Sequence, residues 1–398
     1  MIVRRRIKVF VVAGARPNFV KVAPIMRELE KSAALKPVLV HTGQHYDAEM
    51  SRLFFDQLAI PAPDVDLGVG SASHAVQTAH IMTAFEREML ARKPGLVVVV
   101  GDVNSTLACT LVAAKLLVPV AHVEAGLRSF DRTMPEEINR VVTDSLASFH
   151  FVTEPSGREN LIREGIRGES IHFVGNVMID TLAQNLKRVR SEKVRHPLEG
   201  MGMDYAVVTL HRPTNVDDRE TFAGIIGALE EISRNIPVFL PAHPRTEKNA
   251  RRFGLMKRFS LWRGSASASH RVFMLEPLGY LPFLAMMRGA RMVLTDSGGI
   301  QEETTFLGIP CITLRETTER PVTVEVGTNV VVGSERRKIV GAAMDVLDGR
   351  AKKGRVPELW DGKAARRIVE ALEKAFAREG GVRRGDGGTG RRRGDAVP

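Results

Sequence analysis

Cysteine is scarce in this sequence. Cys109 and Cys311 are the only two in 398 residues, and both lie in apolar surroundings, Leu107–Leu111 and Ile309–Thr313. Two such residues exclude a disulfide framework and leave no metal-type spacing, so we expect a reducing compartment and a cytoplasmic location. A thiol nucleophile is the alternative, but an isolated apolar cysteine more often serves as a small core residue.

Long apolar runs are also absent. No stretch approaches the ~20 consecutive apolar residues that a membrane-spanning helix needs. The N-terminal segment Met1–Ile7 is not followed by the small-residue cleavage site of a signal peptide. We therefore expect no insertion into a membrane.

Aromatic residues are missing where basic residues gather. The formal net charge is +11, and much of the excess lies at the two ends of the chain: Arg4, Arg5, Arg6, Lys8, Arg383, Arg384, Arg391, Arg392 and Arg393. Residues 380–398 contain almost no apolar side chain, which predicts a disordered basic tail. Such a tail can bind nucleic acid or anionic lipid, but it has no aromatic side chains to stack on bases. We favour a solvated end and expect no nucleic-acid partner.

Strand-like apolar runs alternate with helical patterns along the chain. The alternation extends from Lys8 to Arg128 and restarts after about residue 180. It predicts an α/β architecture with parallel sheets, and the length suggests two domains. We expect two Rossmann-like, doubly wound domains, residues 1–179 and 180–359, with a helix at about 360–378 packing back on the first.

Reactive side chains cluster just after the predicted strands. They are Arg16, His45, Asp102, Glu124, Arg128, His211, Arg212, His243, Arg245, Asp296 and Arg320. Loops are polar in most proteins, but those at the opposite strand ends, such as residues 30–32 and 91–94, lack this mixture of His, Arg and carboxylate. Because ligands bind at the carboxyl ends of strands in open α/β sheets, we expect the two domains to face one another across a cleft.

The segment Thr295–Glu303 provides a binding site for an anion. It follows the apolar run Ala290–Leu294 and precedes a helical pattern, so Ser297, Gly298 and Gly299 fall where a strand turns into a helix. Unpaired backbone N–H groups and the helix dipole favour a phosphate there, and glycine lets it approach the backbone closely. This predicts a nucleotide diphosphate site; the alternative is an ordinary tight turn.

Four more side chains could contact such a nucleotide. Glu302 and Glu303, expected in the first turn of the helix, could accept from ribose hydroxyls. His211 and His243 each follow a strand and could donate to phosphate oxygens. The alternatives are an ordinary N-terminal acidic pair and two structural histidines.

The first half supplies candidate acids and bases. Asp102 and Glu124 follow buried strands, and Glu136 and Glu137 stand at a predicted helix start. Carboxylates that crowd a partly dry site raise one another's pKa, which suits proton transfer near neutral pH.

Structural roles are the alternatives for these carboxylates. We prefer helix capping for Glu137. An ion pair with Arg128 or Arg140 would account for Glu124, but a carboxylate at the end of a buried strand needs a stronger reason.

Cofactor motifs are not evident. The loop Gly14–Pro17, followed by Lys21, carries two cations but lacks the glycine spacing of a dinucleotide fingerprint, so we expect no nicotinamide. His41, His45 and His122 lie at different strand ends without i, i+4 spacing, so we expect no metal.

Taken together, these motifs resemble those of the non-hydrolysing UDP-N-acetylglucosamine 2-epimerases, which share the GT-B fold of many glycosyltransferases. The resemblance covers about residues 7–376. The matching motifs are Gly14-x-Arg-Pro-x-x-x-Lys21, Gly101-Asp102, His122-Val-Glu-Ala-Gly-Leu-Arg128, Pro135-Glu-Glu-x-Asn-Arg140, His211-Arg212, Thr295-Asp-Ser-Gly-Gly-Ile-Gln-Glu-Glu303 and Thr317-Thr-Glu-Arg-Pro321.

The resemblance implies a role for each matching position. It places the UDP-sugar between the domains, with phosphate contacts from Arg16, His211, Ser297, Gly298 and Gly299. It further implies that Glu303 binds the ribose, Phe283 the uracil and Arg320 the UDP. The implied catalytic residues are Asp102, Glu124, Glu136, His211 and Lys21.

The implied reaction is an elimination followed by an addition. A carboxylate removes the C2 proton as UDP leaves C1, which gives 2-acetamidoglucal; reprotonation of C2 from the other face and return of UDP give UDP-N-acetylmannosamine. The leaving diphosphate is stabilised by cations and N–H groups. No redox cofactor is required.

Two loops depart from the family pattern and leave the sugar open. They are Ala15-Arg-Pro-Asn18 and Pro213-Thr-Asn215. Related members act on 2,3-diacetamido uronic acid sugars, and a glycosyltransferase of the same fold or a non-catalytic UDP-sugar binder are further alternatives. The resemblance also implies a homodimer and a regulatory UDP-sugar site near Gln44 and His45.

Overall fold

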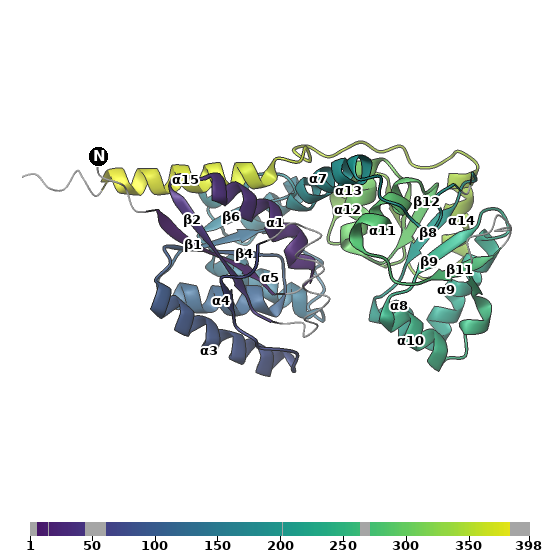
Figure 1. The fold of residues 1–398 in the computed structure, drawn as a ribbon, viewed down its shortest axis with the longest axis horizontal. Helices are drawn as coiled ribbons and strands as arrows, with labels where there is room; N and C mark the ends of the chain where they lie inside the picture. Colours follow the sequence, from purple (N-terminus) through teal and green to yellow (C-terminus); the bar gives the residue numbers. More distant parts are fainter. Residues whose placement is uncertain (1–5, 15, 44–60, 201, 263–270, 383–398) are drawn as a thin grey trace, which may run out of the picture.

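The computed structural model describes residues 6–14, 16–43, 61–200, 202–262 and 271–382. Strands and helices alternate in these residues and form two lobes side by side, each built around one sheet (Figure 1). Every strand pairing in both sheets is parallel. The predicted α/β class with two doubly wound parallel sheets is therefore confirmed.

The first sheet has seven strands within the described residues. Their order across the sheet is β3 (Val65–Asp66), β2 (Leu35–His41), β1 (Ile7–Ala13), β4 (Leu96–Val100), β5 (Val120–Val123), β6 (Phe149–Val152) and β7 (Ile171–Phe173). The helices of this part are α1 (Arg16–Lys31), α3 (His74–Arg92), α4 (Asn104–Lys115), α5 (Pro135–Leu146), α6 (Pro155–Arg163) and the 3₁₀ turn η1 (Gly168–Ser170).

Helices cover both faces of this sheet because its central strands are apolar on both sides. Val9 and Val11 of β1 belong to a core that includes residues of α1, whereas Phe10 and Val12 belong to a second core with α3 and α4. Such uninterrupted apolar strands are typical of parallel sheets buried on both faces.

The second sheet also has seven strands in the described part of the chain. Their order is β10 (Ser260–Leu261), β11 (Val272–Leu275), β9 (Val238–Pro241), β8 (Ala206–Thr209), β12 (Met292–Thr295), β13 (Cys311–Thr313) and β14 (Asn329–Val331). Its helices are α8 (Pro213–Val216), α9 (Arg219–Ile232), α10 (Pro244–Arg252), η2 (Met256–Arg258), α11 (Tyr280–Arg288), α12 (Gly298–Leu307), α13 (Pro321–Glu325) and α14 (Arg336–Leu347).

One helix, α7 (Val177–Ser191), joins the two lobes. Its residues Val177 and Met178 pack in the core of the first lobe, whereas Ile179 and Leu182 pack in the core of the second. The chain then returns along the upper edge in Figure 1, and α15 (Ala364–Val382) lies against α1 and α7 of the first lobe. The boundary predicted after residue 179 therefore falls inside a helix that belongs to both lobes.

Each sheet contains one point at which the strand order reverses. In the first sheet it lies between β1 and β4, and in the second between β8 and β12. Ligands of doubly wound sheets bind at the carboxyl ends of the strands on either side of such a point. The loops after β4, β8 and β12 carry Asp102, His211 and Ser297, and Lys21 lies in α1, the helix that follows β1.

Several elements differ from the sequence predictions. Pro24, expected near a helix start, lies inside α1. Strands β6 and β7 were not predicted, and the helix expected at about 48–58 lies outside the described residues. Helix α15 reaches Val382, three residues into the segment 380–398 predicted as a tail. No helix of the described residues is both long and apolar enough to span a membrane.

Gly175 permits the contact by which the returning segment meets the first lobe. Its φ is +84°, and a Cβ there would lie 2.1 Å from the Leu359 oxygen. Gly308 has φ +72° but open space around it. We expect Gly175→Ala to lower the free energy of unfolding by about 3 kcal/mol and Gly308→Ala by about 1 kcal/mol, because only the first adds overlap to backbone strain. Urea unfolding of both variants measures the difference, and equal losses would contradict this assignment.

Candidate active site between the lobes

Glu124 lies directly after β5 in a strained backbone conformation. Its φ is +70°, a region that non-glycine residues seldom occupy, and its side chain is buried. Oε2 of Glu124 accepts from Nζ of Lys21 at 2.5 Å, and Oε1 has no partner among the described residues. The expected alternative, an ion pair with Arg128 or Arg140, is wrong, because these arginines bind other carboxylates.

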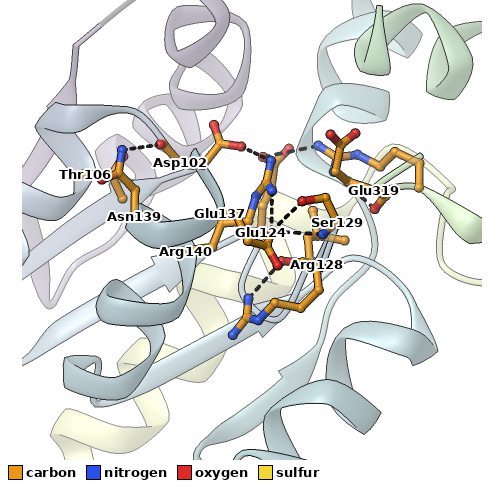
Figure 2. A network of polar contacts seen from close by, with 12 residues as sticks. Asp102, Thr106, Glu124, Arg128, Ser129, Glu137, Asn139, Arg140 and Glu319 are labelled. Carbon is orange, nitrogen blue, oxygen red and sulfur yellow. Dashed lines mark hydrogen bonds and ion pairs between the residues drawn. The ribbon is translucent and has the colours of Figure 1, made fainter. Parts of the chain in front are cut away.

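Asp102, after β4, is held by α5. Arg140 of α5 binds the Asp102 carboxylate, and Asn139 Nδ2 donates to the Asp102 carbonyl at 2.9 Å (Figure 2). Burial disfavours ionisation of Asp102, but Arg140, followed by Lys21 and Arg320, outweighs it and lowers the pKa of the carboxyl. About a quarter of the side chain (26%) is exposed, so this carboxylate stays ionised and reachable at neutral pH.

The two glutamates at the start of α5 differ in their surroundings. Glu137 is buried and accepts from the backbone N–H groups of Ser129 at 2.9 Å and Phe130 at 3.0 Å. Arg140 also binds it, at 2.8 Å, so Glu137 has a structural role, but it fixes the preceding loop and does not cap α5 as we expected. Glu136 is half-buried and has no hydrogen bond or ion pair to the described residues.

The start of α12 presents open backbone N–H groups. Ser297 is the N-cap residue, yet its side chain makes no capping hydrogen bond within the described chain. A Cβ added to Gly298 would meet no atom within 4 Å, so the helix start is uncovered. Free N–H groups at the positive end of a helix dipole favour an anion.

Glu302 and Glu303 were expected in the first turn of this helix and lie in the second. The helix begins at Gly298, and no acidic residue falls in its first turn. Both carboxylates are consequently buried rather than exposed at the helix end.

Arg320 links carboxylates of both lobes. Its Nε donates to Glu302 Oε1 at 2.5 Å, and its NH2 group lies 3.8 Å from Glu124 Oε2. Asn176 Nδ2 also donates to Glu302, at 2.9 Å. Burial alone would lower the pKa of Arg320, but Glu302 and then Glu124 raise it above its ordinary range. Burial also raises the pKa of Glu302, against the attraction of Arg320.

Glu303 is buried beside a tyrosine. The Tyr280 hydroxyl donates to Oε1 at 2.9 Å, whereas Oε2 has no partner in the described residues. Burial raises the pKa of Glu303 to about 7, with the Tyr280 hydrogen bond acting in the opposite direction. The carboxyl is therefore partly protonated near neutral pH.

His211 is oriented by Asp296. Its Nδ1 lies 2.8 Å from Asp296 Oδ1, so Nδ1–H donates to the carboxylate and the other ring nitrogen is left for a ligand. Burial disfavours the charged Asp296, but His211 and the N–H groups of His211 and Arg212 lower its pKa. The ring of His243 packs against His211, with centroids 5.6 Å apart.

A cavity of about 220 Å³ lies between the lobes, next to the charged groups described above. It is lined by Lys21, Met178, Tyr280, Phe283, Ser297, Gly299, Ile300, Glu302, Glu303 and Arg320. Six predicted residues line it, namely Lys21, Phe283, Ser297, Gly299, Glu303 and Arg320. Five predicted residues do not: Asp102, Glu124, Glu136, His211 and Gly298.

The side chains of three further predicted site residues are not described. Arg16 begins α1, but its side chain is not among those described, and Gln44 and His45 lie outside the described residues. Sequence reasoning missed Asn176, Met178 and Tyr280. Tyr280 carried a signal, since it stands in the segment that supplies Phe283, but nothing in the sequence marked Asn176 or Met178.

Two doubly wound lobes with a shared cavity at their carboxyl edges define a two-domain α/β protein of the GT-B type. The sequence model described as UDP-N-acetylglucosamine 2-epimerase matches residues 27–373. The chain therefore belongs to the UDP-N-acetylglucosamine 2-epimerase family.

Individual relatives cover nearly the whole chain. The UDP-N-acetylglucosamine 2-epimerase of Methanocaldococcus jannaschii is 41% identical over 370 residues, 92% of this chain and 98% of that protein. The UDP-2,3-diacetamido-2,3-dideoxy-D-glucuronate 2-epimerase of Pseudomonas aeruginosa is 39% identical over 371 residues, 92% and 99% of the two chains.

Solved structures of two relatives have the same fold as this chain. The crystal structure of the M. jannaschii enzyme in complex with UDP-GlcNAc and UDP matches with a TM-score of 0.80 at 41% identity, covering 92% of this chain and 99% of that one. The UDP-GlcNAc 2-epimerase of Neisseria meningitidis bound to UDP-GlcNAc matches with a TM-score of 0.80 at 30% identity, covering 92% and 100%.

The raised pKa of Glu303 predicts a pH-dependent loss of stability. An acid whose pKa is higher in the folded than in the unfolded protein favours folding at low pH, and this contribution is lost as pH rises from about 4.5 to 7. Glu303→Gln keeps the acceptor for Tyr280 and removes the ionisation. We expect this variant to gain stability relative to wild type, by on the order of 2–3 kcal/mol, as pH rises from about 5 to 8. Urea unfolding across this pH range measures the gain.

Glu137→Gln is the matched control. Hydrogen bonds and Arg140 outweigh burial and lower the pKa of Glu137, so its stabilisation is present above the unfolded pKa and lost only as pH falls below it. This variant should lose stability by a constant amount from about pH 5 to 8. Parallel curves for Glu303→Gln and wild type would show that Glu303 is ionised in the folded protein.

Proposed function

We propose that this protein inverts C2 of UDP-N-acetylglucosamine and gives UDP-N-acetylmannosamine. The observation that carries the proposal is the shared cavity: Glu124 and Lys21 of the first lobe meet Arg320 of the second, beside the open start of α12. An anion-binding helix start opposite paired acid and base groups is what removal of a diphosphate and a neighbouring proton requires. Relatives of 41% identity that carry this activity in their names support the same assignment.

The second lobe is proposed to bind the UDP. The N–H groups of Gly298 and Gly299 bind the diphosphate, together with the Ser297 side chain and with His211, whose free ring nitrogen is set by Asp296. The Ser297 N–H itself donates to Thr295 Oγ1 at 3.0 Å. Arg320 adds a buried positive charge. The remaining assignments are Glu303 for the ribose, Phe283 for the uracil and Arg16 for a phosphate, all carried over from the family motifs.

The first lobe is proposed to move the proton. One carboxylate takes the proton from C2, the C–H electron pair forms the C1=C2 double bond, and the C1–O bond breaks to release UDP. Asp102, kept ionised by Arg140, suits the acceptance of a proton. Glu124 offers its unpartnered Oε1, and Glu136 is free to approach as the third group.

Return of UDP completes the reaction. A carboxylate delivers a proton to the other face of C2 while a diphosphate oxygen rebuilds the bond to C1. Lys21, bound to Glu124 at 2.5 Å, stabilises the charge of that carboxylate between the two steps. No electron leaves the substrate, so the reaction needs no redox cofactor. The two lobes act as the domains that retain the glycal and UDP between the two half-reactions.

A second substrate has a specific argument in its favour. The relative named for UDP-2,3-diacetamido-2,3-dideoxy-D-glucuronate is 39% identical, against 41% for the M. jannaschii epimerase. The segments Ala15–Asn18 and Pro213–Asn215 differ from the pattern of many members. Offering both UDP-sugars in the assay described below identifies the preferred sugar.

We also propose that the protein is a homodimer, located in the cytoplasm. An open groove of about 430 Å³ between α3, α4 and α5 supports a surface for self-association. Met82, Leu107 and Ile138 line it, and half of the Ile138 side chain (50%) is exposed. Light scattering on the purified chain should give twice its mass of 43.8 kDa, and Ile138→Glu should give the single mass. A monomer in the wild type would refute the dimer.

Exchange of the C2 proton tests the reaction. Incubation with UDP-N-acetylglucosamine in deuterated water should place deuterium at C2 of both epimers, which NMR detects directly. Glu124→Gln should reduce exchange by roughly 10²-fold or more, because the amide cannot transfer the proton, while UDP affinity stays within a few-fold. Recovery of unexchanged UDP-N-acetylglucosamine from the wild type would remove the epimerase assignment.

A further inference from the structure

A buried ion pair lies behind the site and contacts none of the cavity. Nδ1 of His122 in β5 is 2.6 Å from Oδ1 of Asp144 in α5, and the two side chains are 0% and 1% exposed. Neither residue lines the space between the lobes. His122 is too far inside the first lobe to bind the substrate, so its pairing with Asp144 must act through neighbouring residues or serve stability alone.

Each nitrogen of the His122 ring faces an acceptor. Nε2 lies 2.9 Å from the carbonyl oxygen of Gly101, which can only accept, and Nδ1 faces the Asp144 carboxylate. Burial disfavours ionisation of Asp144, but His122 and Arg128 outweigh it and lower the pKa of the carboxyl. The His122 ring therefore connects Asp144 to the residue immediately before Asp102.

The second oxygen of Asp144 holds the chain on the other side of Glu124. Oδ2 accepts from the N–H of Gly126 at 3.0 Å and lies 2.7 Å from NH2 of Arg128. Gly126 has φ +76°, and a Cβ there would be 2.2 Å from the Gly157 oxygen, so this turn cannot relax outward. Glu124 is thus flanked, two residues before and two after, by groups bound to one carboxylate.

The same helix also fixes Asp102. Asn139 and Arg140 of α5 bind the carbonyl and the carboxylate of Asp102, about one-and-a-half turns and about one turn before Asp144. Helix α5 therefore holds both loops that carry the candidate catalytic carboxylates, and its first turn carries Glu136.

We propose that Asp144 and His122 are a positioning pair that holds Glu124 in its left-handed conformation and sets its separation from Asp102. The proposal rests on the proposed function, because it assigns these two carboxylates to the reaction. A strained φ persists only where the surroundings over-determine it, and Asp144 supplies contacts on both sides of it. Orienting groups of this kind act on the reacting groups and not on substrate affinity.

Asp144→Asn tests the proposal. The amide oxygen can replace one acceptor but not both, and it removes the charge that faces His122 and Arg128. We expect kcat in the deuterium-exchange assay to fall by about 10- to 100-fold. UDP affinity, measured by calorimetry, should change less than threefold, because the UDP contacts belong to the second lobe.

Asp180→Asn is the matched control. Asp180 is also a buried carboxylate that accepts from two backbone N–H groups, those of Ala364 at 3.0 Å and Ala365 at 2.7 Å, but it caps α15 and does not contact the loops of the site. It should lower the melting temperature and leave kcat within twofold, measured well below the transition. A purely structural Asp144 would behave in the same way.

Two variants of His122 separate its contact with Asp144 from its contact with the Gly101 oxygen. They also test the proposal if Asp144→Asn fails to fold. His122→Gln can still donate to the Gly101 oxygen, whereas His122→Asn reaches Asp144 but not Gly101. We expect the Asn variant to lose more exchange rate than the Gln variant, with UDP affinity unchanged in both. Equal kcat values, within twofold of wild type, would overturn the proposal.

The two hypotheses fail in different ways. If the wild type inverts C2 and the Asp144 and His122 variants keep its kcat, the positioning role of the pair is overturned. The epimerase assignment then still holds. A wild type inactive on UDP-sugars removes the proposed function, and hydrogen exchange then decides the pair. The Gly126 amide should exchange at least tenfold faster in Asp144→Asn than in Asp180→Asn, and equal rates overturn the proposal.

Discussion

The structure depends on opposite charges buried between two lobes. Lys21 and Glu124 of the first lobe and Arg320 and Glu302 of the second form one chain of contacts, with each side chain at most a tenth exposed. Taking such charges out of water costs several kcal/mol per ion, so the cluster is a poor way to gain stability. Apolar residues of equal volume would hold the lobes together better. The proposed reaction accounts for the charges, because it needs a proton acceptor on one side and anion-binding groups on the other.

Sheet topology explains why these residues can meet. In both sheets the chain order reverses next to the first strand of the lobe, and the loops after those strands diverge. Lys21 and Asp102 come from one such point, His211 and Ser297 from the other. Each lobe contributes only part of the chemistry, and α7, with side chains in both cores, limits how the lobes can move.

Sequence patterns predicted strands and helices that follow from local periodicity. They missed contacts between residues that lie far apart in the chain. Strands such as Leu96–Val100 and Val238–Pro241 were predictable because unbroken apolar runs are buried on both faces, whereas β6, Phe149–Val152, was not predicted. The start of α12 was predicted, but an error in counting turns placed Glu302 and Glu303 too early. For Glu124 the nearby Arg128 and Arg140 were the natural partners to consider. Its actual partner, Lys21, is 103 residues away and is brought there only by the pairing of β1, β4 and β5.

The left-handed conformation of Glu124 was also not predicted from the sequence. This conformation determines where the Glu124 carboxylate points. Non-glycine residues avoid this region at a cost of about 1–3 kcal/mol. A glycine at this position would remove the cost and also the carboxylate. The chain instead places glycines at 101 and 126, where positive φ is free, and keeps glutamate where positive φ is costly. That arrangement aims a carboxylate out of the end of a buried strand, toward Lys21 and the opposite lobe, in a direction that an extended backbone would not give. The backbone strain at Glu124 is therefore the energetic cost of directing its carboxylate from the first sheet toward the space between the lobes.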